Sequence, residues 1–463
     1  MLKNKHNKYL NLTYEIHQEF LKKNESICFI AEDIKEAQYL KHSLKLLHSE
    51  NEILLFPEQE ILPYDHFSIP EKVIKERFQI INHDSDKPYI LISTVKNLFE
   101  IYPQAEYFQS SKNFSIGDNI SVNKLVTILE SNNYIKRVNV ELINEFTIRG
   151  GIVDIFSPIY KNPLRIEIFD DKIESIRFFN VDSQLSIENI NSFAISNGSL
   201  FSLNPSRIEN FVNMWRTYFH EYDERFCELF QKVKNGSIPE GIEVYLPFFF
   251  DLTVNFNDLF NINNIYTSKD LNNEIHKYNK FIHQRFEDES FEEKRPLVKP
   301  TDLYLETAEV KKIISNSKII INSEIIDIPN SFKGLVDEIN SNKFKYNNLL
   351  IITSVQAEIP EIKKLFNTSS SVINEINEIN PGINIMVGKP IRPFHLKDKD
   401  VVVMHKEYVD GIDSYVFEND KNLIKDSKER DFTLFKMNDY VIHDNYGLGI
   451  YAGLEIVETS DTK

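Results

Sequence analysis

The residues that come closest to nucleotide chemistry are Gly388, Lys389 and Pro390, which follow Val387. A phosphate-binding loop has the pattern GxxxxGK followed by Ser or Thr; its backbone N–H groups surround the phosphates and its hydroxyl holds Mg²⁺. Here the first glycine is missing, and proline, which has no N–H group, stands where the hydroxyl is needed. The pattern occurs nowhere else in the 463 residues. We therefore predict no phosphate loop and no bound cofactor in this chain.

Other residue types that support catalysis or metal binding lack the spacing that such chemistry requires. Asp337 and Glu338 form an acidic pair, but the surrounding pattern predicts the surface of a helix. The two cysteines, Cys28 and Cys227, lie far apart within apolar runs, as is typical of buried thiols in a reducing compartment. The sequence holds twelve histidines but no CxxC or HExxH spacing. We predict no catalytic residue and no metal site.

The segment 164–169 indicates a different kind of chemistry, the recognition of another protein. Successive side chains of a β-strand point to opposite faces, so Ile166 and Ile168 share one face. Arg165, Glu167 and Phe169 share the other. If the isoleucines face the core, Phe169 is held in solvent beside an arginine, a combination typical of binding hot spots. The alternative is that Phe169 is buried in a sandwich and the arginines only solubilise the surface; alternation alone leaves both open.

Arg149 is a candidate for the same surface. It ends the preceding strand-like run, just before Gly150 and Gly151, and is placed to join Arg165 and Phe169 across the sheet. The glycine pair itself is most typical of a bulge or of a close approach of two backbones.

The last apolar runs, within 437–458, flank Gly447 and Gly449 and predict a hairpin, as at the start of a small barrel. Ile456 and Val457, near the end of the second run, are expected either in a core or at a sheet edge open to a partner strand. A two-stranded hairpin is only marginally stable in water. We therefore expect the native product to continue past Lys463.

These candidate residues need elements that position them, and two regions of the chain predict α/β structure. In the first, 26–104, helical spacing covers 34–48 and another helix is expected to begin near Lys96. The apolar strand-like runs of that region are 27–30, 53–56 and 89–93. Continuous apolar strands joined by helices predict a parallel sheet covered on both faces. The signal returns over 307–411, with strands at 349–353 and 401–404.

Between these regions the pattern changes. From about 113 to 196, short alternating runs are separated by Gly and Asp-Asp turns, which predicts a small, mostly antiparallel domain inserted into or appended to the first. Helical spacing follows over 208–233, around the one tryptophan, Trp215, and over 271–286. The charge-rich stretches are 287–299, a linker or exposed helix end, and 413–431, a linker.

Size and charge exclude several classes of protein. A chain of 463 residues exceeds one compact core and predicts about three or four domains. The formal net charge of −17 argues against a chain that wraps nucleic acid by itself. No apolar run approaches the roughly 18 residues of a membrane span, and the N-terminal residues lack a signal-peptide core. We predict a cytoplasmic protein with no membrane contact.

The order of several motifs resembles the N-terminal part of the bacterial transcription-repair coupling factors, the Mfd family. The motifs are Leu62-Pro63-Tyr64-Asp65, the block 146–184, Trp215, Gly241-Ile242-Glu243 and the hairpin 441–454. The segment 148–156 is shared with the excision protein UvrB and does not separate the two families. The hairpin is similar to the polymerase-interacting, CarD-like module, which UvrB lacks, so the resemblance favours the coupling factors.

The resemblance implies an α/β multidomain protein. Its expected parts are 1–118 (UvrB-like domain 1a, a degenerate RecA-type α/β domain without a Walker A loop), 119–196 (domain 2, a small, mostly antiparallel α+β insertion that binds UvrA), 197–325 (domain 1b), 326–412 (a further small α/β domain 3), 413–433 (a linker) and 434–463 (the truncated start of a Tudor/SH3-like β-barrel that contacts RNA polymerase).

The resemblance also implies a function, transcription-coupled nucleotide-excision repair, in which the protein recruits UvrA to RNA polymerase stalled at a DNA lesion. By family pattern the UvrA contacts fall on Arg149, Arg165 and Phe169, and the contact with the polymerase β subunit falls at Ile456 and Val457. The ATP- and Mg²⁺-dependent motor that moves the full-length family member along DNA would lie beyond Lys463. The alternatives are a UvrB-like ATPase that loads onto damaged DNA and a CarD-like regulator of transcription.

Overall fold

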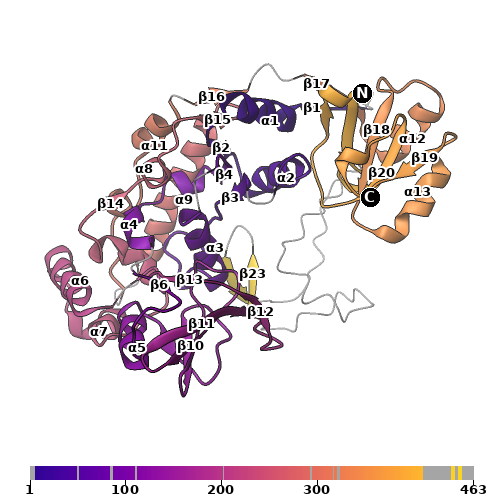
Figure 1. Ribbon diagram of the computed structural model, residues 1–463. Helices are drawn as coiled ribbons and strands as arrows, with labels where there is room; N and C mark the ends of the chain where they lie inside the picture. The colour runs from indigo at the N-terminus through magenta and orange to yellow at the C-terminus, as the bar shows by residue number, and fades with distance from the viewer. Residues whose placement is uncertain are drawn as a thin grey trace. The chain divides into compact units, whose positions relative to one another are not determined.

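The computed structural model of the chain describes residues 6–49, 52–83, 87–109, 112–201, 203–291, 295–315, 317–320, 324–409, 440–443 and 447–450 (Figure 1). The chain divides into two compact units, Met1–Asp413 and Ser414–Lys463. Several separate sheets make up the larger unit, so the chain is a mixed α/β protein. Among the helices of the described ranges, none combines the length and apolar composition that a membrane span needs.

The first sheet is parallel throughout, as the apolar runs predict. Its order is β16-β15-β2-β4-β3. The strands are β2 (Ile27–Ala31), β3 (Ile53–Leu55), β4 (Ile90–Thr94), β15 (Ile265–Thr267) and β16 (Lys318–Ile319). Ile27 and Phe29 pack against α1 (Leu12–Lys23) and α2 (Ile34–Leu44), while Cys28 and Ile30 face the larger core on the other side. Burial on both faces explains why the strands are apolar at every position.

The larger core contains most of the helices that were predicted from spacing. They are α6 (Pro205–Tyr218) and α7 (Glu228–Lys234), within the predicted 208–233, and α9 (Asn272–Glu289). Helix α3 (Glu71–Ile81), which was not predicted, also packs against this core. Trp215 of α6 is buried there, and so is Cys227. The prediction of a helix that begins near Lys96 is wrong, because only a short 3-10 helix, Lys96–Leu98, forms there. The reason is local, because Asn97 is buried and donates to the backbone of Phe56, and strand β5 (Tyr102–Pro103) follows at once.

A six-stranded sheet occupies the part predicted to be mostly antiparallel, in the order β12-β11-β10-β9-β8-β7. Its strands are β7 (Ile135–Lys136), β8 (Glu145–Arg149), β9 (Ile152–Ile155), β10 (Leu164–Phe169), β11 (Lys172–Phe179) and β12 (Ser186–Asn189). All neighbours are antiparallel except β7 and β8. Helix α5 (Val122–Ser131) packs Leu125 and Leu129 against one face, which we call the inner face.

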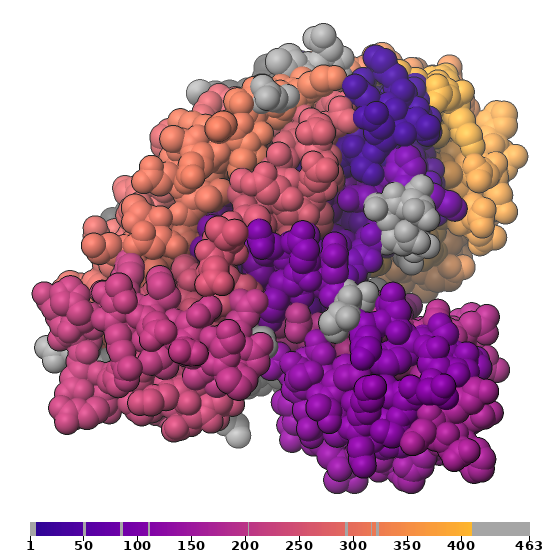
Figure 2. All heavy atoms as spheres, turned by 60° about the vertical axis from the view of Figure 1, so that its left-hand side comes forward, coloured from indigo at the N-terminus to yellow at the C-terminus, as the bar shows by residue number. Residues whose placement is uncertain are grey.

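The two ends of this segment lie side by side. Strand β6 (Lys112–Ser115) pairs with β13 (Ser192–Ile195), and Phe114 stacks on Phe193 at a ring-centroid distance of 5.2 Å. The chain leaves the body at β6 and returns at β13, and strands β15 and β16 then complete the first sheet. The space-filling view shows the segment as a closely packed purple lobe (Figure 2). The segment is therefore an insertion rather than an appended piece.

A second α/β sheet follows, in the order β19-β20-β18-β22-β21. Its strands are β18 (Asn348–Thr353), β19 (Ser370–Val372), β20 (Ile383–Val387), β21 (Phe394–Leu396) and β22 (Val401–His405). All pairs are parallel except β21 with β22. Helix α12 (Phe332–Asn340) carries Asp337 and Glu338, as predicted.

One pairing was not predicted. Strand β1 (His6–Leu10) pairs antiparallel with β17 (Ile325–Pro329), and His6 Nδ1 lies 3.1 Å from Oδ1 of Asp327, 321 positions along the chain. Beside it, Asn11 both donates to and accepts from the backbone of His395. The first strand of the chain is therefore part of a structure formed by residues much later in the sequence.

The hairpin predicted near the end of the chain is confirmed. Strands β23 (Tyr440–His443) and β24 (Gly447–Ile450) pair antiparallel. The expected linker 413–433 and the candidate residues Ile456 and Val457 lie outside the described residues.

Candidate protein-docking site

The alternation predicted for β10 is confirmed. Ile166 and Ile168 are buried on the inner face with α5, and Phe169 is 74% exposed. The sandwich alternative for Phe169 is therefore wrong. We call the opposite side of β8, β9 and β10 the outer face; it carries Arg165 and Glu167 as well.

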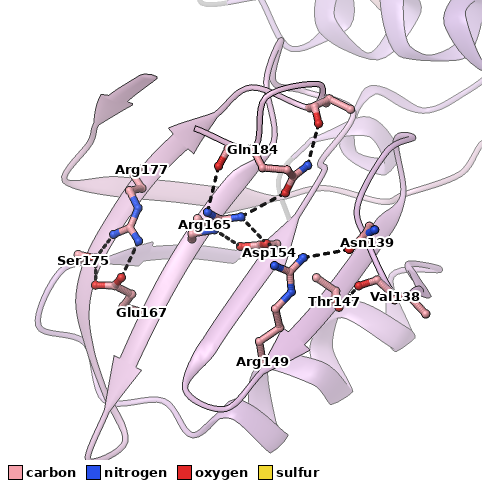
Figure 3. A network of polar contacts seen from close by, with 11 residues as sticks. Val138, Asn139, Thr147, Arg149, Asp154, Arg165, Glu167, Ser175, Arg177 and Gln184 are labelled. Atoms are coloured by element: carbon pink, nitrogen blue, oxygen red, sulfur yellow. Dashed lines mark hydrogen bonds and ion pairs between the residues drawn. The ribbon is translucent and has the colours of Figure 1, made fainter. Parts of the chain in front are cut away.

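Arg165 does not extend freely into solvent. Its Nε and Nη2 donate to the two carboxylate oxygens of Asp154, at 2.7 and 2.9 Å (Figure 3). Asp154 lies directly opposite on β9 and is buried. The guanidinium also donates to the backbone and side-chain oxygens of Gln184 and lies over the ring of Phe179 at 4.5 Å. These hydrogen bonds to Asp154, the largest cause, raise the pKa of Arg165. Arg165 and Asp154 thus form an ion pair whose two charges compensate one another, close to the backbone of the outer face.

Arg149 is the more accessible of the two predicted arginines. Its Nη2 donates to Oδ1 of Asn139 at 3.2 Å and lies 3.9 Å from Oδ2 of Asp154. About half of the side chain is exposed (49%). Both arginines therefore meet the same carboxylate from opposite strands (Figure 3), but Arg149 keeps donors that a partner can use.

A second ion pair on the outer face was missed by sequence reasoning. Arg177 Nη2 lies 2.6 Å from Glu167 Oε1, and the hydroxyl of Ser175 donates to the other oxygen of that carboxylate at 2.7 Å (Figure 3). The hydrogen bonds from Arg177 and then Ser175 lower the pKa of Glu167. Alternation along β11 places Ser175 and Arg177 on one side of the strand. Which residue of β10 they meet depends on a shift in the pairing of β10 with β11 between Glu167 and Ile168, and no local sequence pattern predicts this shift.

Backbone geometry fixes the position of Phe169. A two-residue turn, Asp170 and Asp171, connects β10 to β11, and both residues have positive φ, 49° and 58°. On the other side a Cβ at Gly151 would lie 2.4 Å from the carbonyl oxygen of Ile168, and Gly151 accepts a hydrogen bond from the N–H of Ile168. The close backbone approach predicted for the glycine pair is confirmed at Gly151. It secures the strand end that carries Phe169.

The start of α2, next to the end of β2, is where a phosphate would bind in a nucleotide-binding α/β protein. Here carboxylates fill that position. Glu36 accepts from the N–H of Glu32 at 2.9 Å, and Asp33 accepts from the N–H of Glu36 at 2.8 Å. Glu36 also accepts from Ser268 and from Arg392. In the described ranges no group of His, Cys, Asp and Glu is arranged to hold a metal ion.

Comparison with known proteins places this site within a recognised domain. A family described as the UvrB interaction domain matches residues 113–201, which include the six-stranded sheet and the pair β6–β13. The transcription-repair-coupling factor of Haemophilus influenzae is 24% identical over 94% of this chain, and that of Rickettsia conorii is 25% identical over 97%.

The chain is similar to an N-terminal portion of the transcription-repair-coupling factors. It spans 40% and 41% of the length of these two relatives. The factor of Bacillus subtilis is 30% identical over 39% of this chain and 16% of its own length. The resemblance drawn from motifs is therefore confirmed. The roles assigned to Arg149, Arg165 and Phe169 stay predictions.

Proposed function

We propose that this chain acts in transcription-coupled nucleotide-excision repair by binding UvrA on the outer face of its six-stranded sheet. One observation carries the proposal: the match to the UvrB interaction domain coincides with the sheet on which Phe169 is exposed and Arg149 keeps open donors. An exposed aromatic beside an arginine is typical of residues that dominate binding energy. Binding requires no bond to be made or broken, so the site functions as a docking surface.

The rest of the proposal concerns the other partners. The C-terminal hairpin, with Ile456 and Val457, is proposed to start a Tudor/SH3-like barrel that binds the β subunit of RNA polymerase, and thereby links UvrA to a stalled polymerase. The sheet β16-β15-β2-β4-β3 is proposed to be a degenerate RecA-type domain that binds neither ATP nor Mg²⁺. ATP-driven movement on DNA belongs, in this proposal, to the remainder of a full-length protein.

The test is a calorimetric titration of the purified chain with UvrA, using two matched variants. Phe169→Ala and Phe226→Ala each remove a phenylalanine that is 74% exposed, the second outside the matched domain. We expect Phe169→Ala to weaken UvrA binding by about 2 kcal/mol or more, roughly thirtyfold, and Phe226→Ala to leave it unchanged. An unchanged affinity in Phe169→Ala, or no binding by the unaltered chain, would contradict the proposal.

A further inference from the structure

We propose that the segment 137–142 forms the second half of the docking face and contacts UvrA beside Arg149. This inference rests on the proposed function and adds residues to it. Val138 is 87% exposed and Leu142 is 54% exposed. Large apolar side chains in solvent at this level do not stabilise the fold. Both flank β8, Val138 beside Thr147 and Leu142 beside Glu145, so they border the strand that ends in Arg149.

The segment is anchored by one buried residue within it and one that directly follows it. Val140 and Ile143 are buried in a small cluster with Phe156 and Phe179. Two apolar side chains therefore point inward and hold the segment, while Val138 and Leu142 point outward. Phe179 is also the ring beneath Arg165. The cluster consequently connects the segment to the same group of residues that makes up the outer face.

Hydrogen bonds from β8 fix the backbone of the segment. The carboxylate of Glu145 accepts from the N–H groups of Glu141 and Leu142, at 2.9 and 2.8 Å. The hydroxyl of Thr147 donates to the carbonyl oxygen of Val138 at 3.1 Å (Figure 3). All three bonded positions, Val138, Glu141 and Leu142, are exposed. Because the segment is already ordered, it loses little conformational freedom when a partner binds it.

Arg149 joins the segment to the rest of the face. It donates to Asn139 at 3.2 Å, and its neighbour across the sheet is Ile152, which is followed by Glu167 on β10. Adjacent strands lie about 4.8 Å apart, so β8 and β10 are separated by roughly 10 Å. The face therefore has Arg149 with the strand that ends in Phe169 on one side and Val138 and Asn139 on the other, while Leu142 lies further along β8, beside Glu145.

This arrangement defines the chemistry of the partner surface. The part of UvrA that fits it has a carboxylate opposite Arg149 and apolar groups on both sides of that carboxylate. A purely acidic surface would leave Val138 and Leu142 in contact with charge, which is unfavourable. A purely apolar surface would bury the guanidinium of Arg149 without a partner for its remaining donors.

The experiment compares Leu142→Ser and the double variant Val138→Ser/Leu142→Ser with a control of the same residue type. Leu21, on α1, is 58% exposed and lies outside the matched domain, so Leu21→Ser removes a similar side chain elsewhere. We expect the double variant to weaken UvrA binding at least tenfold in calorimetry with an unchanged melting temperature, and Leu21→Ser to change it less than twofold. An affinity within twofold for the double variant, while Phe169→Ala still weakens binding, would overturn the inference and leave the proposed function intact.

A second measurement does not depend on removing a side chain. A photo-crosslinker attached at Val138→Cys is expected to capture UvrA, and one attached at Leu21→Cys is not. Capture by neither or by both overturns the inference. If the unaltered chain does not bind UvrA, the proposed function fails first, and the partner assigned to the segment fails with it.

Discussion

Arg165 and Asp154 form a two-pronged ion pair in which Nε and Nη2 lie 2.7 and 2.9 Å from the two oxygens of a carboxylate that is only 1% exposed. Asp154 also lies 3.9 Å from Arg149. One buried carboxylate therefore orients both arginines of the candidate site. Asp154 is a positioning residue, since a partner on the outer face cannot reach it directly.

The first prediction concerns the stability of this pair. Asp154→Asn leaves a largely buried guanidinium opposite a neutral group, and removing one partner of a buried pair costs about 3 kcal/mol. We expect a loss of that order in urea unfolding. The double variant Asp154→Asn/Arg165→Gln should lose less than the sum of the two single variants. Strictly additive losses would show that the two side chains do not stabilise one another.

The second prediction separates the two arginines by salt dependence. Arg149→Ala is expected to weaken UvrA binding several-fold and to reduce the effect of salt on that affinity, because an exposed charge acts through solvent. Its free energy of unfolding should stay within about 0.5 kcal/mol. Arg216, similarly exposed and paired with Glu224 outside the matched domain, provides the control variant Arg216→Ala. A salt dependence that is the same in Arg149→Ala and the unaltered chain would contradict this assignment.

The third prediction concerns the turn that holds Phe169. Both turn residues have positive φ, a conformation that glycine adopts without strain. Asp171→Gly should therefore raise the free energy of unfolding by about 0.5–1 kcal/mol, and Asp171→Val should lower it, because β-branched residues disfavour positive φ. Thermal unfolding of the two variants measures the difference. Equal melting temperatures would mean that the turn is not under strain.

The fourth prediction is a dependence of stability on pH. His48 is buried against Phe20, and its Nε2 lies 2.9 Å from Nδ1 of His17. Burial is the largest cause that lowers the pKa of His48 to about 4, and the nearby His17 is the second. Glu52 raises this pKa, but by less. The unfolded chain gains a proton on His48 below about pH 6.5, whereas the folded chain gains it only near pH 4. Stability should consequently fall on acidification through this window, by roughly 3 kcal/mol at its lower end.

Melting temperatures measured across this pH window test the sign and the size of the effect. His48→Gln cannot titrate and should lose this contribution. His220, exposed at the surface, gives the control variant His220→Gln, whose pH profile should match that of the unaltered chain. A profile for His48→Gln as steep as that of the unaltered chain would show that acid acts elsewhere.

The fifth prediction distinguishes the docking function from a UvrB-like ATPase. A phosphate at the start of α2 would meet the carboxylates of Glu32, Asp33 and Glu36, and the N–H of Glu32 already donates to one of them. We expect Mg²⁺ and ATP to leave the melting temperature of the chain unchanged and to yield no ATP turnover. A raised melting temperature would support the alternative function.

Local patterns were sufficient for the features that depend on neighbouring residues. Continuous apolar runs predicted the parallel sheet, and period-two alternation placed Ile166 and Ile168 on one face and Phe169 on the other. Alternation left open which of these faces is buried, and the structure buries the isoleucines. Gly151 was expected at a close backbone approach, which its contact with Ile168 confirms. In each case the signal comes from one segment of the sequence.

Features that depend on register or on distant segments were not predictable in this way. The pairing of Arg165 with Asp154 requires the alignment of β9 with β10, and that of Arg177 with Glu167 follows a register irregularity. Alternation placed Arg165 on the same face as Phe169, and Arg149 was a candidate for that surface, with no distinction between the two arginines. The structure instead assigns Arg165 to an internal pair and leaves Arg149 as the accessible one.

The pairing of β1 with β17 also has a consequence for biosynthesis. Residues 6–10 are translated long before their partner strand, which is complete only after Pro329 has left the ribosome. Until then β1 has no partner strand, so its backbone N–H and C=O groups must bind water or be covered by a chaperone. Strand β1 can therefore reach its native place only after a segment 321 positions further along has been made, and a ribosome paused before that point would hold a nascent polypeptide in which β1 is still unpaired.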